Sequence, residues 1–162
     1  MRKIAATYIY PIVLPPIKYG ILYLDDNNTI VKIKDNGGEM IEEQECEYYN
    51  GVIVPGFVNA HTHLELSHLK NFFKQGAGMR NFLQSILTRP KTEISEITEY
   101  VEQYDKLMYN QGIVAVSDIS NTLDTLEIKA SSKIYYHTFV ELFGLVKQRS
   151  TDIYKKGVSI CD

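Results

Sequence analysis

The hydrophobic pattern changes about a third of the way along the chain. Up to residue 51, β-branched and aromatic residues form short runs over 4–10, 20–24 and 29–34, and polar or proline-containing turns separate them. The sequence Asp25-Asp26-Asn27-Asn28 is typical of a hairpin turn. A second turn is expected over 48–51 (Tyr-Tyr-Asn-Gly). These features predict a β-rich segment over residues 1–51.

From residue 52 onward, strand-like runs alternate with helical ones. Continuous apolar runs over 52–58 and 113–116 predict strands, and residues 134–142 are a third strand candidate, closed by Gly144. Apolar residues at helical spacing predict a helix over 79–87 that stops before Pro90. A second helix is expected over 97–108, with Ser95 as its N-cap and Gly112 at its C-terminal end. A short helix is expected over 123–129, and the tail over 146–162 resembles the start of another helix.

This alternation predicts an α/β fold with a parallel sheet. The continuous apolar runs are typical of parallel strands that are covered on both faces. In such folds, functional side chains gather at the carboxyl ends of the strands.

Composition and charge exclude several classes of function. The chain has 162 residues and a net charge of −3, without a Lys/Arg cluster, so no nucleic-acid partner is expected. No apolar run reaches the roughly 18 residues of a spanning helix. Tyr8, Tyr10 and Pro11 interrupt the only stretch that resembles a signal peptide, and Cys46 and Cys161 have no ligand or disulfide spacing. We therefore expect a cytoplasmic protein without a membrane partner.

Three of the four histidines fall within His-Thr-His-Leu-Glu-Leu-Ser-His, residues 61–68. In an extended segment, residues two apart point the same way, so His61 and His63 are expected to present their imidazoles on one face. Imidazole pairs suit Zn²⁺, and iron or manganese fit similar ligands. A catalytic zinc site usually needs three protein ligands. The pair therefore predicts part of a site for one divalent metal, with zinc as the first candidate.

The segment GVIVPGFVNAHTHLELS resembles the first barrel strand of the amidohydrolase superfamily, whose PGxxxxHxH signature is matched by Pro55, Gly56, His61 and His63. The segments NAHTHLELSHL, GAGMRNFL and GIVAVSDISN are similar to the branch of cytosine deaminases, guanine deaminases and chlorohydrolases, and to its aminofutalosine deaminases in particular.

The resemblance implies the N-terminal part of a (β/α)8 TIM-type barrel, preceded by a segment of a small β-sandwich. The expected domains are 1–51 (β-sandwich segment) and 52–162 (first three βα units). It also implies that His61 and His63 bind the metal, and that metal-activated water deaminates a purine-like or other N-heterocyclic small molecule.

Three carboxylates are candidates for substrate binding, and each has an alternative. Glu65 follows the histidine pair, where it contacts substrate or is a solvated loop residue. Asp118, at the end of the second strand, either orients a neighbouring ligand residue or forms an ordinary turn. Glu141 lies near the end of the third strand, where it lines the site or is paired within the barrel. His68 is expected in a loop or helix start, and His137 in the core.

Several family features have no counterpart in the sequence. A closed barrel takes roughly 250 residues, and the family's general base and late metal ligands are missing, so the catalytic residues stay unknown. We expect the chain to be an incomplete barrel, inactive by itself. A cyclic-amide hydrolase of the dihydroorotase or imidazolonepropionase type, and a non-catalytic binding module, remain as alternatives, and a homo-oligomer stays open.

Overall fold

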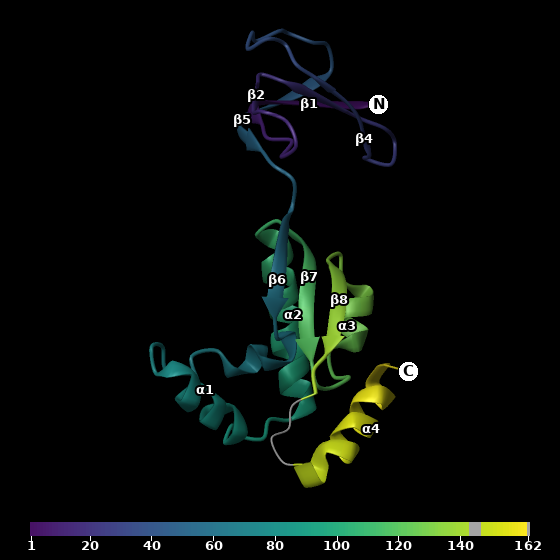
Figure 1. Cartoon of the computed structure of the whole chain (residues 1–162). Coiled ribbons are helices and arrows are strands. Elements are labelled where there is room, and N and C mark those ends of the chain that lie inside the picture. Colours follow the sequence, from purple (N-terminus) through teal and green to yellow (C-terminus); the bar gives the residue numbers. More distant parts are fainter. Residues whose placement is uncertain (143–146, 162) are drawn as a thin grey trace. The chain divides into compact units, whose positions relative to one another are not determined.

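The computed structural model describes residues 1–142 and 147–161 and shows a mixed α/β protein. The chain divides into two compact units, Met1–Pro55 and Gly56–Asp162 (Figure 1). The expected strand end at Gly144 and the two ends of the expected tail helix, Val146 and Asp162, lie outside the described residues.

The first unit is a five-stranded sheet. β1 is its central strand and pairs antiparallel with β2 and β3 and parallel with β5, while β4 pairs antiparallel with β3. The strands are β1 (Arg2–Ile9), β2 (Ile17–Lys18), β3 (Ile21–Leu24), β4 (Ile30–Lys34) and β5 (Cys46–Ile53). The predicted hairpin is confirmed as β3–β4, and Asp25 Oδ1 accepts the backbone N–H groups of Asn27 and Thr29 in its turn. That this sheet is part of a β-sandwich stays a prediction.

Two expectations near the junction of the units are wrong. The expected turn over 48–51 lies inside β5, because Tyr48 and Tyr49 pair with Ala5 and Ala6 of β1. The expected strand over 52–58 is divided: residues 52 and 53 end β5, and a new strand begins at Phe57. Pro55 offers no N–H to a ladder, which explains the break.

The second unit contains the three-stranded parallel sheet that the sequence predicts. Its order is β6-β7-β8, and both pairings are parallel. The strands are β6 (Phe57–Thr62), β7 (Ile113–Ser120) and β8 (Tyr135–Val140). The helices are η1 (Leu64–Leu69), α1 (Gly78–Leu87), α2 (Ile94–Asn110), α3 (Leu126–Ser131), η2 (Lys147–Arg149) and α4 (Ser150–Cys161).

The C-terminal end of α2 agrees with the sequence-based prediction, and its N-terminal cap does not. Gly112, the residue after the C-cap Gln111, has φ +83°, as expected of a C-terminal glycine. Ser95 is not the N-cap, because α2 already begins at Ile94. The cap residue is Glu93, whose side chain makes no capping hydrogen bond.

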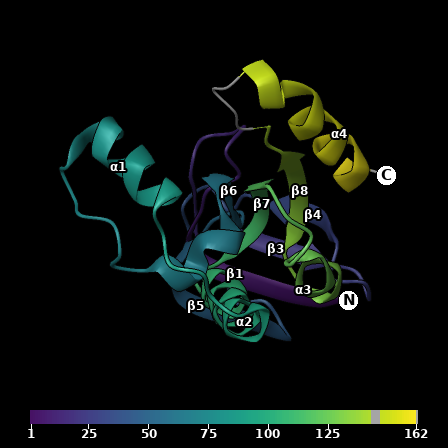
Figure 2. The ribbon, with the colours of Figure 1, turned by 90° about the horizontal axis from the view of Figure 1, so that it is seen from below.

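Among the described residues, the parallel sheet is covered on one face only. α2 and α3 lie against one face, where Val116, Asp118 and Ser120 of β7 are buried (Figures 1 and 2). On β8, Tyr135 is 68% exposed and Phe139 50% exposed, and His137 between them is exposed as well. The expectation of cover on both faces is therefore wrong for the described chain, and so is the expectation of a core position for His137.

Within the described residues, none of the helices combines the length and the apolar character that crossing a membrane requires.

Candidate functional site

The end of β6 holds the two histidines of the predicted metal site. Thr62 pairs in register with Asp118, and an irregularity in the β6–β7 ladder lies between Asn59 and Thr62. His61 and His63, on either side of Thr62, bring their rings to a centroid distance of 5.4 Å with an interplanar angle of 69°. The alternation of an extended strand thus places the two imidazoles beside each other, as the sequence predicts.

The donor chemistry of this pair fits two ligands of a divalent metal. No hydrogen bond engages a ring nitrogen of either histidine in the part of the chain that the structure describes, so these nitrogens are available. The same part contains no group of three or more His, Cys, Asp and Glu side chains arranged to hold a metal. Because a catalytic zinc site usually takes three protein ligands, the pair by itself is not a complete site of that kind.

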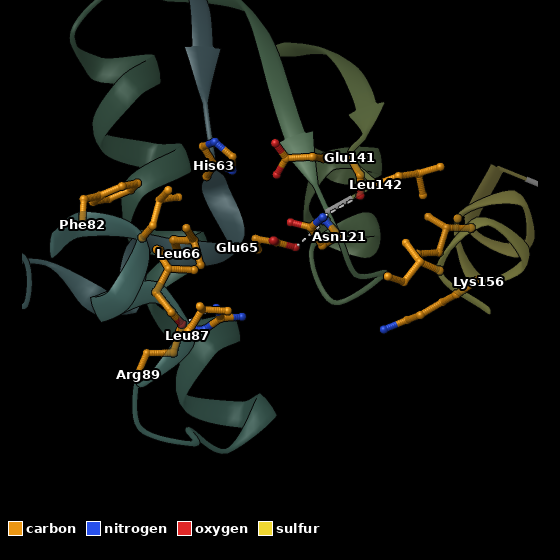
Figure 3. A pocket seen from close by; sticks show the side chains of 15 residues that line it. His63, Glu65, Leu66, Phe82, Leu87, Arg89, Asn121, Glu141, Leu142 and Lys156 are labelled. Atoms are coloured by element: carbon orange, nitrogen blue, oxygen red, sulfur yellow. Dashed lines mark hydrogen bonds between the residues drawn. The ribbon is translucent and has the colours of Figure 1, made fainter. Parts of the chain in front are cut away.

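A cavity of about 380 Å³ opens at the carboxyl ends of the strands (Figure 3). Its walls are mainly apolar and come from α1 and α4, and six polar or charged side chains are interspersed with them. The polar lining residues are His63, Glu65, Arg89, Asn121, Glu141 and Lys156. Apolar walls with a few polar groups are typical of small-molecule sites, and this volume lies within their usual range.

Asp118 is fully buried at the end of β7 and is held from two sides. Its Oδ1 accepts the backbone N–H of Leu64 at 2.7 Å, and its other oxygen forms an ion pair with Lys129 of α3. Lys129 is itself buried and also donates to Thr138 Oγ1 of β8 at 3.3 Å. The carboxylate therefore connects the residue after His63 to the helix-covered face of the sheet.

Glu65 is 6% exposed and holds the loop after β7. Its Oε2 accepts from the Ser120 hydroxyl at 3.2 Å and from the backbone N–H groups of Asn121 and Thr122 at 3.0 and 3.1 Å. The Thr122 hydroxyl donates to the same oxygen at 3.1 Å. Oε1 makes no hydrogen bond with the described residues, so it is the atom of Glu65 that is available to a ligand in the cavity.

Glu141 follows β8 and has an exposed side chain. Its backbone is fixed, because its N–H donates to Ser120 O at 3.1 Å and its carbonyl accepts from Asn121 Nδ2 at 2.6 Å. Figure 3 shows its carboxylate directed toward His63 across the cavity. Substrate binding by Glu65, Asp118 and Glu141 stays a prediction. His68, expected in a loop or helix start, lies in the last turn of η1.

Sequence reasoning missed Lys129, Asn121 and Thr122. Lys129 shares the buried face of α3 with Thr125, four residues earlier. Since neither residue is apolar, hydrophobic periodicity gives no signal there. Asn121 and Thr122 read as ordinary turn residues after Ser120, and only their contacts with Glu65 and Glu141 show that they organise the edge of the cavity.

No family model matches the sequence. The chain is 26% identical over 129 residues to the adenosine deaminase of Helicobacter pylori, an alignment that covers 78% of this chain and 31% of the relative.

Solved structures of two deaminases and a chlorohydrolase are similar to this chain in fold. The aminofutalosine deaminase of Helicobacter pylori, in complex with methylthio-coformycin, matches with a TM-score of 0.75 and 21% identity, over 96% of this chain and 39% of that one. The atrazine chlorohydrolase of Arthrobacter aurescens, in complex with zinc, matches with a TM-score of 0.71 and 18% identity, over 91% and 37%. A guanine deaminase of C. acetobutylicum with bound guanine matches with a TM-score of 0.53 and 13% identity.

These matches confirm the resemblance to the deaminase and chlorohydrolase branch of the amidohydrolase superfamily that the sequence indicated. The fold is the mixed α/β arrangement of those barrel proteins, over the part that is shared. The chain spans about a third of the curated relative, 31% of its length.

Proposed function

We propose that this chain forms the first part of the active site of a metal-dependent hydrolase that acts on C–N bonds other than peptide bonds. The substrate is a purine-like or other N-heterocyclic small molecule, which is deaminated by water. The observation that carries the proposal is the pair His61 and His63, whose ring centroids lie 5.4 Å apart at the end of the parallel strand β6 and whose ring nitrogens make no hydrogen bond with the described residues.

In this proposal His61 and His63 hold one divalent metal, with zinc as the first candidate and iron or manganese as alternatives. When bound, such an ion lowers the pKa of a water molecule toward neutrality and so makes hydroxide available at physiological pH. The remaining ligand and the general base come from parts of the family's barrel that have no counterpart in this sequence.

The cavity beside His63 is the proposed substrate site. Its apolar walls on α1 and α4 suit the faces of a heterocyclic ring. The carboxylate of Glu141 and Oε1 of Glu65 are hydrogen-bond acceptors for ring N–H or amino groups of that substrate. The names of the similar proteins, which are deaminases of adenosine, aminofutalosine and guanine, support this class of substrate.

The test is the metal content of the purified 162-residue chain, measured by elemental analysis after gel filtration. We expect the wild-type chain to retain divalent metal at its two histidines, less tightly than a complete three-ligand site would, and His61→Ala/His63→Ala to lose it. His137→Ala is the matched control, because His137 is an exposed histidine of the same sheet and is expected to leave the metal content unchanged. A chain that elutes as a folded species and carries no more metal than the double variant would count against the proposed metal site at His61 and His63.

A further inference from the structure

Two reciprocal carboxylate links join the segment directly after His63 to the end of β7. In one direction, Asp118 Oδ1, on β7, accepts the N–H of Leu64 at 2.7 Å. In the other direction, Glu65 Oε2 accepts the N–H groups of Asn121 and Thr122, just after β7, at 3.0 and 3.1 Å. Residue 63 is therefore followed by two residues that are both tied to the neighbouring strand end.

Burial makes these links difficult to rearrange. Asp118 is 0% exposed and Lys129, its ion-pair partner, is 9% exposed. A buried carboxylate that leaves its partners loses both the ion pair and the charge-assisted hydrogen bond without gaining water. The Leu64 N–H, and with it the backbone at His63, is accordingly fixed with respect to β7.

We propose that Asp118, with Lys129 as its counter-ion, and Glu65 are positioning residues for His63. They act through the backbone and keep the His63 imidazole beside that of His61, at the separation that one small cation can bridge. That a cation binds between the two rings rests on the proposed function. The placement of the ring does not, and it can be measured without metal.

Two double variants separate the hydrogen-bond acceptor from the charge. Asp118→Leu/Lys129→Met replaces the ion pair with apolar groups of similar size, an exchange that buried pairs often tolerate, and it removes the acceptor of the Leu64 N–H. Asp118→Asn/Lys129→Gln also removes the charges but keeps an amide oxygen as acceptor. Glu65→Leu tests the second link.

Asp105→Ala is the matched structural control. Asp105, on α2, accepts from the Ser132 hydroxyl at 2.6 Å and from the Tyr136 hydroxyl at 2.8 Å. Burial, followed by the hydrogen bond to Asp105, raises the pKa of Tyr136. The substitution therefore breaks a comparable carboxylate network in the same unit without touching residues 61–65.

The readouts are the nuclear Overhauser contact between the two imidazole rings in the metal-free chain and the Zn²⁺ affinity in competition with a chelator. For Asp118→Leu/Lys129→Met and Glu65→Leu, we expect loss of the ring contact and a Zn²⁺ affinity lower by a factor of about 10 or more, the usual effect of losing a group that orients a ligand. The Asn/Gln variant and Asp105→Ala are expected to keep the ring contact and the wild-type affinity.

The proposal is overturned if the ring contact survives in the Leu/Met variant, or if Asp105→Ala abolishes it equally. A measurement on the wild-type chain covers the case in which a variant does not fold: the Leu64 amide is expected to exchange slowly with solvent, and rapid exchange contradicts the proposal. The wild-type chain can also fail to bind Zn²⁺ while the ring contact is lost in Asp118→Leu/Lys129→Met and kept in the Asn/Gln variant. In that case the metal site of the proposed function fails and the positioning role stands.

Discussion

At the scale of single residues, the sequence predicted the histidine pair and missed what supports it. Two histidines separated by one residue in a strand share a face as a consequence of backbone geometry, so their proximity follows from local sequence alone. The partner of Asp118 lies on a helix 11 positions later, and no local pattern distinguishes Lys129 from a solvated lysine. Such pairings depend on tertiary packing.

In the first unit, the side-chain contacts of Glu43 lower the pKa of its carboxyl group. The Tyr23 hydroxyl donates to both of its carboxylate oxygens at 2.8 Å, and Lys3 and Lys34 lie at 3.1 Å. These hydrogen bonds, that of Tyr23 first, lower the pKa of Glu43 to about 2 from an ordinary value of 4.5. The same contact raises the pKa of Tyr23.

The stability of the first unit is therefore expected to fall with acidification. A carboxylate with a lower pKa in the folded state contributes stability above its unfolded value, here 4.5, and loses that contribution as the pH falls to about 2. Glu43→Gln should flatten the pH dependence of the unfolding midpoint over this window. The pH dependence that comes from Glu47, whose pKa is also lowered to about 2 by Arg2, should remain in this variant.

The measurement is the urea-induced unfolding midpoint between pH 2 and 6. Glu42→Gln is the control, since Glu42 is exposed and next in sequence. Equal slopes for Glu43→Gln and the wild-type chain would show that the Glu43 contacts do not persist in solution.

At the scale of elements, Gly56 permits the start of β6 to approach β7. A Cβ on Gly56 would lie 2.3 Å from Val114 Cγ1 and 2.7 Å from Cγ2. Gly56 lies between the two sheets in sequence: the ladder with β1 ends at Ile53, before Pro55, and the ladder with β7 begins at Phe57.

Gly56→Ala is expected to destabilise the second unit by about 1–3 kcal/mol, the range for overpacking at a site that cannot relax. Val114→Ala in the same chain should recover most of the loss, because it removes both clashing methyl groups and Val114 is 47% exposed. Urea unfolding of the two single variants and the double variant gives the coupling energy. Strictly additive effects would mean that the contact with Val114 does not limit this position.

The elements of the second unit were easier to predict than those at the junction. Helical spacing and a following proline predicted α1, and strand-helix alternation predicted the parallel pairing of β6, β7 and β8, since both signals are local. β5 was misread because its strand pairing with β1, more than 40 residues earlier in the sequence, outweighs the turn character of Tyr-Tyr-Asn-Gly.

At the scale of the whole molecule, the parallel sheet presents an uncovered apolar face among the described residues. Val58, Tyr135 and Phe139 are 65%, 68% and 50% exposed. Parallel sheets are ordinarily covered on both faces, and exposed apolar patches promote association. The structural relatives continue well beyond the part that is shared, since this chain matches 39% of the aminofutalosine deaminase and 37% of the chlorohydrolase.

We therefore expect the 162-residue chain to self-associate through this face, and Tyr135→Ser/Phe139→Ser to reduce the association without destabilising the fold. Both side chains are largely solvated, so their loss should change the free energy of unfolding by no more than about 0.5 kcal/mol each, as is usual at surface positions.

Leu123→Ser/Leu126→Ser is the matched control, because both leucines are 50% exposed outside this sheet. Sedimentation velocity over a range of concentrations measures the association. If the control pair reduces association equally, the face of β6-β7-β8 has no special role. If the Tyr135/Phe139 variant unfolds, these side chains are covered in solution by a second copy and contribute to stability there.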